Sequence, residues 1–347
     1  MKDKRTVFLV LAVVAVALTW ILPDFRLFQL ATAATWAIAM LGLNLLTGYN
    51  GQISLGHGAF FGIGAYTTAI CVTRYGMSYP MAILLAIVLC AVAGVIVGVP
   101  ALRFSGMSLS LITVALAFAF PQLLQQFKSL SGGTPGIIVP TADQPTSPSW
   151  LGLTADQFLY LVIVLCAIVV FALGANLVRG RWGLAIMSVR DNPIAAASMG
   201  VSLSRVKATV FATSAVFAGY AGGLQVMLLG YIGPESVSFT ISITMLTGIV
   251  LGGLGTISGA LVGGLFTVIL PDIGGGISRS APGIINGVII VLVMLMAPRG
   301  LVGTASLWTN KLLRRYRMRG DTAEQAPPRP ASAPLTHASA GRDADGD

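Results

Sequence analysis

Long apolar runs separated by short polar segments constrain the fold of this chain most strongly. The runs lie at about 6–22, 28–47, 57–73, 80–99, 107–127, 157–178, 207–229, 240–256, 258–275 and 283–298. An α-helix needs about 20 apolar residues to cross the hydrocarbon core of a bilayer. The chain is 55% hydrophobic and only 10% charged, whereas soluble domains carry about 25% charged residues. The sequence therefore predicts an all-α, polytopic transmembrane helix bundle with about ten spans.

The first, eighth and ninth runs each have a further feature. The first follows a charged start, Lys2 to Arg5, but no small-x-small cleavage pattern comes after it, so we interpret it as an uncleaved first span rather than a signal peptide. The stretch 240–275 is interrupted by Gly252-Gly253-Leu254-Gly255. That interruption is compatible with two short helices or with one pair of half-helices.

The distribution of lysine and arginine predicts the orientation of the bundle. If the N-terminus is cytoplasmic and the chain crosses ten times, only four of the 21 basic residues, Arg26, Arg74, Lys128 and Arg279, fall on the outer side. Lysine and arginine concentrate on the cytoplasmic side of membrane proteins. We therefore expect both termini inside, and we attribute the net charge of +9 to this bias rather than to nucleic-acid binding.

The domain organisation follows from the same pattern. Residues 1–306 are predicted to form the transmembrane domain, and residues 307–347 a basic juxtamembrane stretch followed by a disordered cytoplasmic tail rich in Pro, Ala and Asp. Between the fifth and sixth runs, residues 128–156 are nearly uncharged and rich in Gly, Pro, Ser and Thr. We expect this segment to be an ordered loop on the outer face, because it could not cross lipid with its backbone unsatisfied.

A glycine-rich polar segment between the second and third runs is the first candidate for a functional element. Glycine permits close approach of helices and broken helices that expose backbone groups to a cavity. The segment therefore lies on a translocation path or forms a helix-packing seam. Its candidate residues are Asn44, Gly48, Gly51, Gln52, Ser54, Gly56, His57 and Gly58.

Further candidates lie near the eighth and ninth runs. Gly252 and Gly255 have the same two interpretations, and the Thr-Gly and Ile-Ser pairs around Gly255 faintly repeat those around Gly48. Glu235 is an acidic residue at the outer membrane boundary, which is either a functional group or an exposed loop carboxylate. The three cysteines lack paired spacings, and His57 has no second histidine nearby, so no metal site is expected.

The long cytoplasmic loop, residues 179–207, contains signals for a short helix. Asn192 can cap a helix, Pro193 suits its first position, and Gly200 can end it. We predict a helix over 193–199. Because two turns are marginal alone, either a partner holds this helix or it is an ordinary surface helix.

Sequence patterns for catalysis are missing. The chain has no GxxxxGK[ST] phosphate-binding loop, no Ser/His/Asp set and no paired carboxylates, so we expect neither an enzyme nor a bound cofactor. Energy for uphill transport would then come from a partner or from an ion gradient.

Three motifs resemble one transporter family. They are the N-L-x-x-G-x-x-G-x-x-S-L-G-H-G-A-F run at 44–60, the R-D-N-x-x-A-A-x-x-x-G run at 190–200 with its continuation to Gly222, and the glycine-rich run at 248–264. Together they resemble the permease subunits of branched-chain amino-acid ABC transporters of the Liv type, in particular the longer of the two paired permeases.

The resemblance implies a second homologous permease, two cytoplasmic ABC ATPases, a soluble substrate-binding protein and a bacterial inner-membrane location. It also implies that the segment at 190–200 couples the permease to an ATPase. The residues of this coupling segment are Arg190, Asp191, Asn192, Pro193, Ala196, Ala197 and Gly200.

Two alternatives remain open. One is a permease of the same family that carries urea or another small solute. The other is an autonomous ion-coupled carrier, for which His57, Glu235 and Asp272 are the available ionisable groups near the membrane.

Overall fold

The computed structural model describes residues 13–101, 107–148, 151–275, 287 and 300–304. All of these belong to one compact unit, Met1–Ala305. The predicted segment 307–347, most of the predicted span 283–298 and the first half of the span 6–22 lie outside the described residues.

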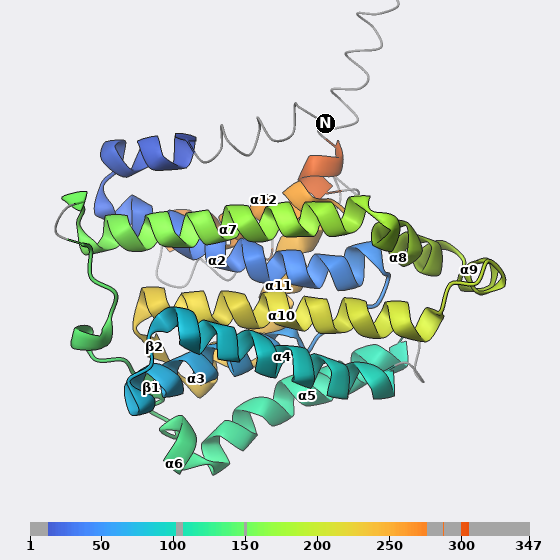
Figure 1. Cartoon of the computed structure of the whole chain (residues 1–347), viewed down its shortest axis with the longest axis horizontal. Coiled ribbons are helices and arrows are strands. Elements are labelled where there is room, and N and C mark those ends of the chain that lie inside the picture. Colours follow the sequence, from blue (N-terminus) through green and yellow to red (C-terminus); the bar gives the residue numbers. More distant parts are fainter. Residues whose placement is uncertain (1–12, 102–106, 149–150, 276–286, 288–299, 305–347) are drawn as a thin grey trace, which may run out of the picture. The chain divides into compact units, whose positions relative to one another are not determined.

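The described residues are mostly helical (Figure 1). After a helical segment at 13–21, the long helices are α2 Asp24–Asn44, α3 His57–Tyr75, α4 Tyr79–Ala101, α5 Met107–Gln126, α7 Ala155–Arg179, α10 Leu203–Leu229, α11 Phe239–Gly252 and α12 Ile257–Gly275. The shorter helices are α6 Lys128–Ser131, α8 Arg181–Asp191 and α9 Pro193–Ser198, with a π-helical turn η1 Leu45–Tyr49 and 3₁₀ turns η2 Thr141–Asp143 and η4 Pro234–Val237. The strands β1 Ile137–Ile138 and β2 Tyr231–Ile232 form one short antiparallel ladder.

The lengths of these helices agree with a membrane-spanning bundle. Within the described residues, five helices are long and apolar enough to cross a bilayer: Asp24–Tyr49, Tyr79–Val99, Ser108–Gln126, Ala155–Arg179 and Leu203–Leu229. α11 has 14 residues and reaches about 21 Å at 1.5 Å per residue, short of the roughly 30 Å hydrocarbon core. The prediction of an all-α, polytopic membrane protein is confirmed, while the count of ten spans stays a prediction.

Helix α10 lies at the centre of the packing, against α2, α3 and α4. Glycine makes the closest of these contacts possible: a Cβ on Gly64 of α3 would overlap the backbone of Gly219 in α10. A Cβ on Gly222 would likewise overlap the carbonyl of Phe61. Small residues let helices approach in membranes, where apolar side chains alone supply little driving force between helices.

The irregular stretch 240–275 forms two helices, α11 and α12, that pack as a hairpin. Between them, Gly253 and Gly255 have φ angles of 127° and 71°, a region that residues with a side chain rarely adopt. A Cβ on Gly252 would overlap the carbonyl of Gly259 across the hairpin. The structure thus confirms an interruption at these glycines, with one helix on each side of it.

The helix ends gather at two opposite ends of the bundle (Figure 1). At the end that carries α6 and the strands, Ile137 pairs with Ile232, and Thr154 Oγ1 donates to Asp24 Oδ1 at 3.4 Å. The described part of the predicted outer loop is ordered there, through α6, β1 and η2. At the opposite end lie α8 and α9. Helices that cross one bilayer in succession must place their connections at two opposite ends, as these helices do.

Candidate functional site

A break between α2 and α3 forms the centre of the candidate site. Helix α2 passes into the π-helical turn η1, which ends at Tyr49. Gly51, two residues later, has a φ of 73°, and the Gln52 N–H donates to the Leu46 carbonyl at 3.0 Å. The chain is then non-helical until His57 begins α3. Single π-helical turns inside helices are frequently found at functional sites.

Asn44 fastens this break to the α11–α12 hairpin. Its side chain is fully buried, and Oδ1 accepts a hydrogen bond from the Gly255 N–H at 2.9 Å. Nδ2 donates to the Thr256 carbonyl at 2.7 Å. A buried amide satisfied by two backbone groups of a distant turn fixes that turn in one position.

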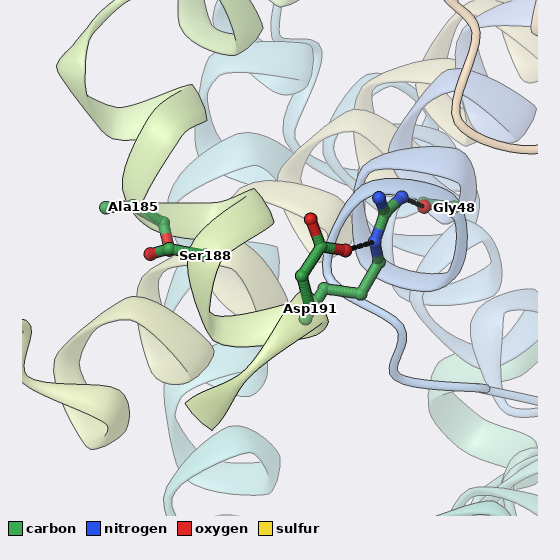
Figure 2. A network of polar contacts seen from close by, with 5 residues as sticks. Gly48, Ala185, Ser188 and Asp191 are labelled. Carbon is green, nitrogen blue, oxygen red and sulfur yellow. Dashed lines mark hydrogen bonds and ion pairs between the residues drawn. The ribbon is translucent and has the colours of Figure 1, made fainter. Parts of the chain in front are cut away.

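Gly48 lies at the same junction and contacts the segment predicted as the long cytoplasmic loop. A Cβ at Gly48 would overlap the backbone nitrogen of Gly255. The carbonyl of Gly48 accepts a hydrogen bond from Arg190 Nη1 at 2.9 Å, and Arg190 Nε donates to Asp191 Oδ1 at 2.9 Å. Figure 2 shows this network from close by, with Gly48 and Asp191 labelled.

The structure thus brings together residues that the sequence had placed in two separate groups. Asn44, Gly48, Gly51 and Gly255 were predicted for a path or a packing seam, and Arg190 for a coupling loop. All five meet at one junction, since a Cβ on Gly51 would lie 2.9 Å from Arg190 Cγ. No local sequence pattern indicates this meeting.

The non-helical backbone of the break is held by α5, and the first turn of α3 is held by α11. Thr113 Oγ1 accepts a hydrogen bond from the Leu55 N–H at 3.1 Å, and Ser110 Oγ donates to the Ile53 carbonyl at 3.2 Å. From α11, Ser242 Oγ accepts a bond from the Gly58 N–H at 2.9 Å. Sequence reasoning did not single out these three hydroxyl residues, although each lies within an apolar run.

The remaining polar candidates of this segment are buried to different degrees. His57 is 1% exposed, and its ring meets Phe60 edge-on with the ring centroids 6.4 Å apart. Ser54 is fully buried and Gln52 is partly exposed. Gly56 packs on α5, where a Cβ would lie 2.6 Å from the Thr113 carbonyl oxygen. Among the residues that the structure describes, no group of three or more His, Cys, Asp or Glu side chains can hold a metal ion.

The acidic candidates lie away from this junction. Glu235 is exposed in η4, next to β2, at the end of the bundle that carries the strands. Asp272 forms an ion pair of 3.4 Å with Arg26, in which both side chains are about half exposed. Neither carboxylate joins His57 in a buried set.

The predicted short helix is confirmed as α9. Asn192 Oδ1 accepts a hydrogen bond from the Ala195 N–H at 3.0 Å, and Pro193 occupies the first turn. At the other end Gly200 has a φ of 82° and donates to the Ala197 carbonyl at 3.0 Å. The Val201 N–H donates to the Ala196 carbonyl at 3.0 Å, and this second bond completes a Schellman motif.

Sequence reasoning missed helix α8, which precedes α9 within the predicted loop. Its buried residues, Gly183, Ile186 and Val189, recur every three positions. This spacing is typical of an amphipathic helix and could have identified α8.

The α8–α9 pair leaves several large apolar side chains exposed. Leu184, Ile194 and Met199 are 66%, 82% and 85% exposed, and α8 and α9 line a cavity of about 510 Å³ that includes Leu184 and Met199. Exposed apolar side chains gathered at one place typically mark an interaction site.

Helices long and apolar enough to cross a bilayer, joined by a non-helical glycine-rich segment with buried amide contacts, are features of membrane transport proteins. Residues 25–298 match the family described as the permease component of branched-chain amino acid transport systems, and the chain belongs to that family.

The chain is similar to several curated permeases. It is 31% identical over 320 residues to the high-affinity branched-chain amino acid transport system permease protein LivM of Escherichia coli K12, covering 86% of this chain and 75% of LivM. The LivM protein of Salmonella typhimurium gives the same identity and coverage. The LivH permease of Salmonella typhimurium is 24% identical over 286 residues, covering 78% of this chain and 92% of LivH. No solved structure matches the chain.

Proposed function

We propose that this chain is one membrane subunit of an ATP-driven importer for branched-chain amino acids. It would pair with a second homologous permease, dock two cytoplasmic ABC ATPases, and receive solute from a soluble binding protein. The family match over 25–298 carries this proposal. The similarity to both LivM and LivH proteins supports a paired arrangement of two related permeases.

The proposal includes a topology and a location. We infer ten spans with both termini in the cytoplasm of a bacterial cell, in its inner membrane. Residues 1–306 form the transmembrane domain, and residues 307–347 form the basic juxtamembrane stretch and cytoplasmic tail. The gathering of helix ends at two opposite ends of the bundle supports this topology.

We propose that α8 and α9 form the ATPase-coupling element. A two-turn helix is marginal alone, and α9 is capped at both ends yet leaves Ile194 82% exposed. A groove on an ATPase would cover this side chain. The residues assigned to the coupling element are Arg190, Asp191, Asn192, Pro193, Ala196, Ala197 and Gly200.

We assign the break between α2 and α3 to the translocation machinery. This segment lies between the predicted spans 28–47 and 57–73, and glycine-rich non-helical backbone of this kind can line a cavity. The residues assigned to the path or to the packing that shapes it are Asn44, Gly48, Gly51, Gln52, Ser54, Gly56, His57, Gly58, Gly252 and Gly255, with Glu235 at the outer end. In this proposal the chain performs no catalytic step and holds no cofactor, and the ATPases supply the energy.

The test is uptake of radiolabelled leucine into proteoliposomes that contain this chain with its candidate partners. We expect uptake to require ATP and to persist when proton and sodium gradients are collapsed. Ala196→Arg should abolish it, because Ala196 is the buried residue of α9. Ser204→Arg is the matched control, since Ser204 is exposed in the first turn of α10.

Two outcomes would replace the proposal. Leucine uptake driven by an ion gradient without ATP would establish an autonomous carrier. ATP-dependent uptake of urea, with no uptake of leucine, would keep the permease and change its solute.

A further inference from the structure

We infer that Arg190 is a positioning residue that transmits movement of the α8–α9 pair to the break in α2 and to the α11–α12 hairpin. The inference rests on the proposed function, in which the α8–α9 pair docks an ATPase. It adds the contacts through which a movement of the docked α8–α9 pair is transmitted to the interior of the bundle.

Two hydrogen bonds fix the orientation of the Arg190 guanidinium. Nη1 donates to the Gly48 carbonyl at 2.9 Å, and Nε donates to Asp191 Oδ1 at 2.9 Å. The guanidinium is planar and rigid, so two bonds to different nitrogens determine how the group lies. Arg190 therefore acts as a stiff link from the last turn of α8 to a specific carbonyl of the η1 turn.

The η1 turn is suited to accept this link. The last carbonyls of a helix have no partner inside the helix, and that end carries partial negative charge. The carbonyl of Gly48 is one of these groups. Gly51 leaves room for the arginine side chain, because a Cβ there would lie 2.9 Å from Arg190 Cγ.

The link continues into the α11–α12 hairpin. Gly48 is packed directly against the backbone of Gly255, and the Arg190 Nη1 atom lies 3.8 Å from the position of a Cβ on Gly255. Asn44, which lies one turn before Gly48, bonds to both Gly255 and Thr256. A displacement of Arg190 thereby reaches the α11–α12 hairpin as well as the η1 turn.

Arg190 stands at the boundary between the exposed and the buried part of this junction. Its side chain is 38% exposed, whereas Asn44 is fully buried. Helix α8 is also anchored by the buried side chains of Ile186 and Val189. Loss of the arginine donors should therefore leave α8 in place and remove only the polar link.

The test measures the number of leucine molecules transported per ATP hydrolysed, in proteoliposomes that hold the complete complex. Arg190→Gln should lower this ratio at least about fivefold, the lower end of typical coupling between sites. Arg190→Lys, which retains one charged donor, should give an intermediate ratio. Arg205→Gln is the control. Arg205 is also an exposed arginine, and it lies in the first turn of α10, shortly after α9 in the chain.

A transport ratio for Arg190→Gln equal to that of Arg205→Gln would overturn the inference and leave the proposed function intact. If Arg190→Gln does not insert, Arg190→Lys decides, and a wild-type ratio for that variant overturns the inference. If the wild-type complex shows no ATP-dependent uptake at all, the proposed function and this inference fail together.

Discussion

The backbone N–H of Gly255 donates a hydrogen bond of 2.9 Å to Oδ1 of Asn44, across 211 positions of the chain. The same side chain donates to the carbonyl of Thr256. One amide thus joins the end of α2 to the turn between α11 and α12. The loss of this side chain leaves two backbone groups of the turn without their partner.

Asn44→Ala should therefore destabilise the protein. Leaving buried polar groups unsatisfied costs about 1–3 kcal/mol, so we expect a lower midpoint of thermal unfolding in detergent, followed by circular dichroism. Asn176→Ala is the matched control, because Asn176 is an exposed asparagine of α7. Equal midpoints for the two variants would show that the Asn44 contacts contribute nothing to stability.

Much of the bundle could be predicted from the sequence, because the length of an apolar run is a local property. The predicted runs at 57–73 and 107–127 correspond to α3 His57–Tyr75 and α5 Met107–Gln126. Helix α9 was predicted from its caps, which are local as well. The junction at Gly48 could not be predicted, since nothing in a glycine-rich run identifies the distant turn or arginine that it contacts.

The packing of α3 on α10 gives a second prediction. Gly64→Ala should prevent this packing, because the new Cβ would overlap the backbone of Gly219, and backbone atoms cannot move aside like a flexible side chain. We expect little folded protein by size-exclusion chromatography of a fluorescent fusion. Gly98→Ala is the control: it also changes a buried helical glycine, but its new Cβ would lie 3.3 Å from Phe211 Cβ. A normal yield of folded Gly64→Ala protein would contradict this account of the packing.

The end of α9 gives a third prediction. Gly200 has a φ of 82°, and no atom lies within 4 Å of a Cβ placed on it, so a substitution there tests backbone strain alone. Gly200→Val should cost about 1–2 kcal/mol locally and reduce ATP-dependent leucine uptake. Gly200→Asn should retain more uptake, because asparagine tolerates this conformation. Equal leucine uptake by the Gly200→Val and Gly200→Asn variants would show that the backbone conformation at Gly200 is unimportant for coupling.

The central claim, that α9 docks an ATPase, is tested most directly by photo-cross-linking. A photoreactive amino acid replaces Ile194, which is 82% exposed on α9, or Ile138, which is 73% exposed at the opposite end of the bundle. After illumination of the assembled complex, we predict an adduct between this chain and the ATPase for position 194 and none for position 138. Absence of the ATPase adduct at position 194 in a complex that transports leucine would contradict the account.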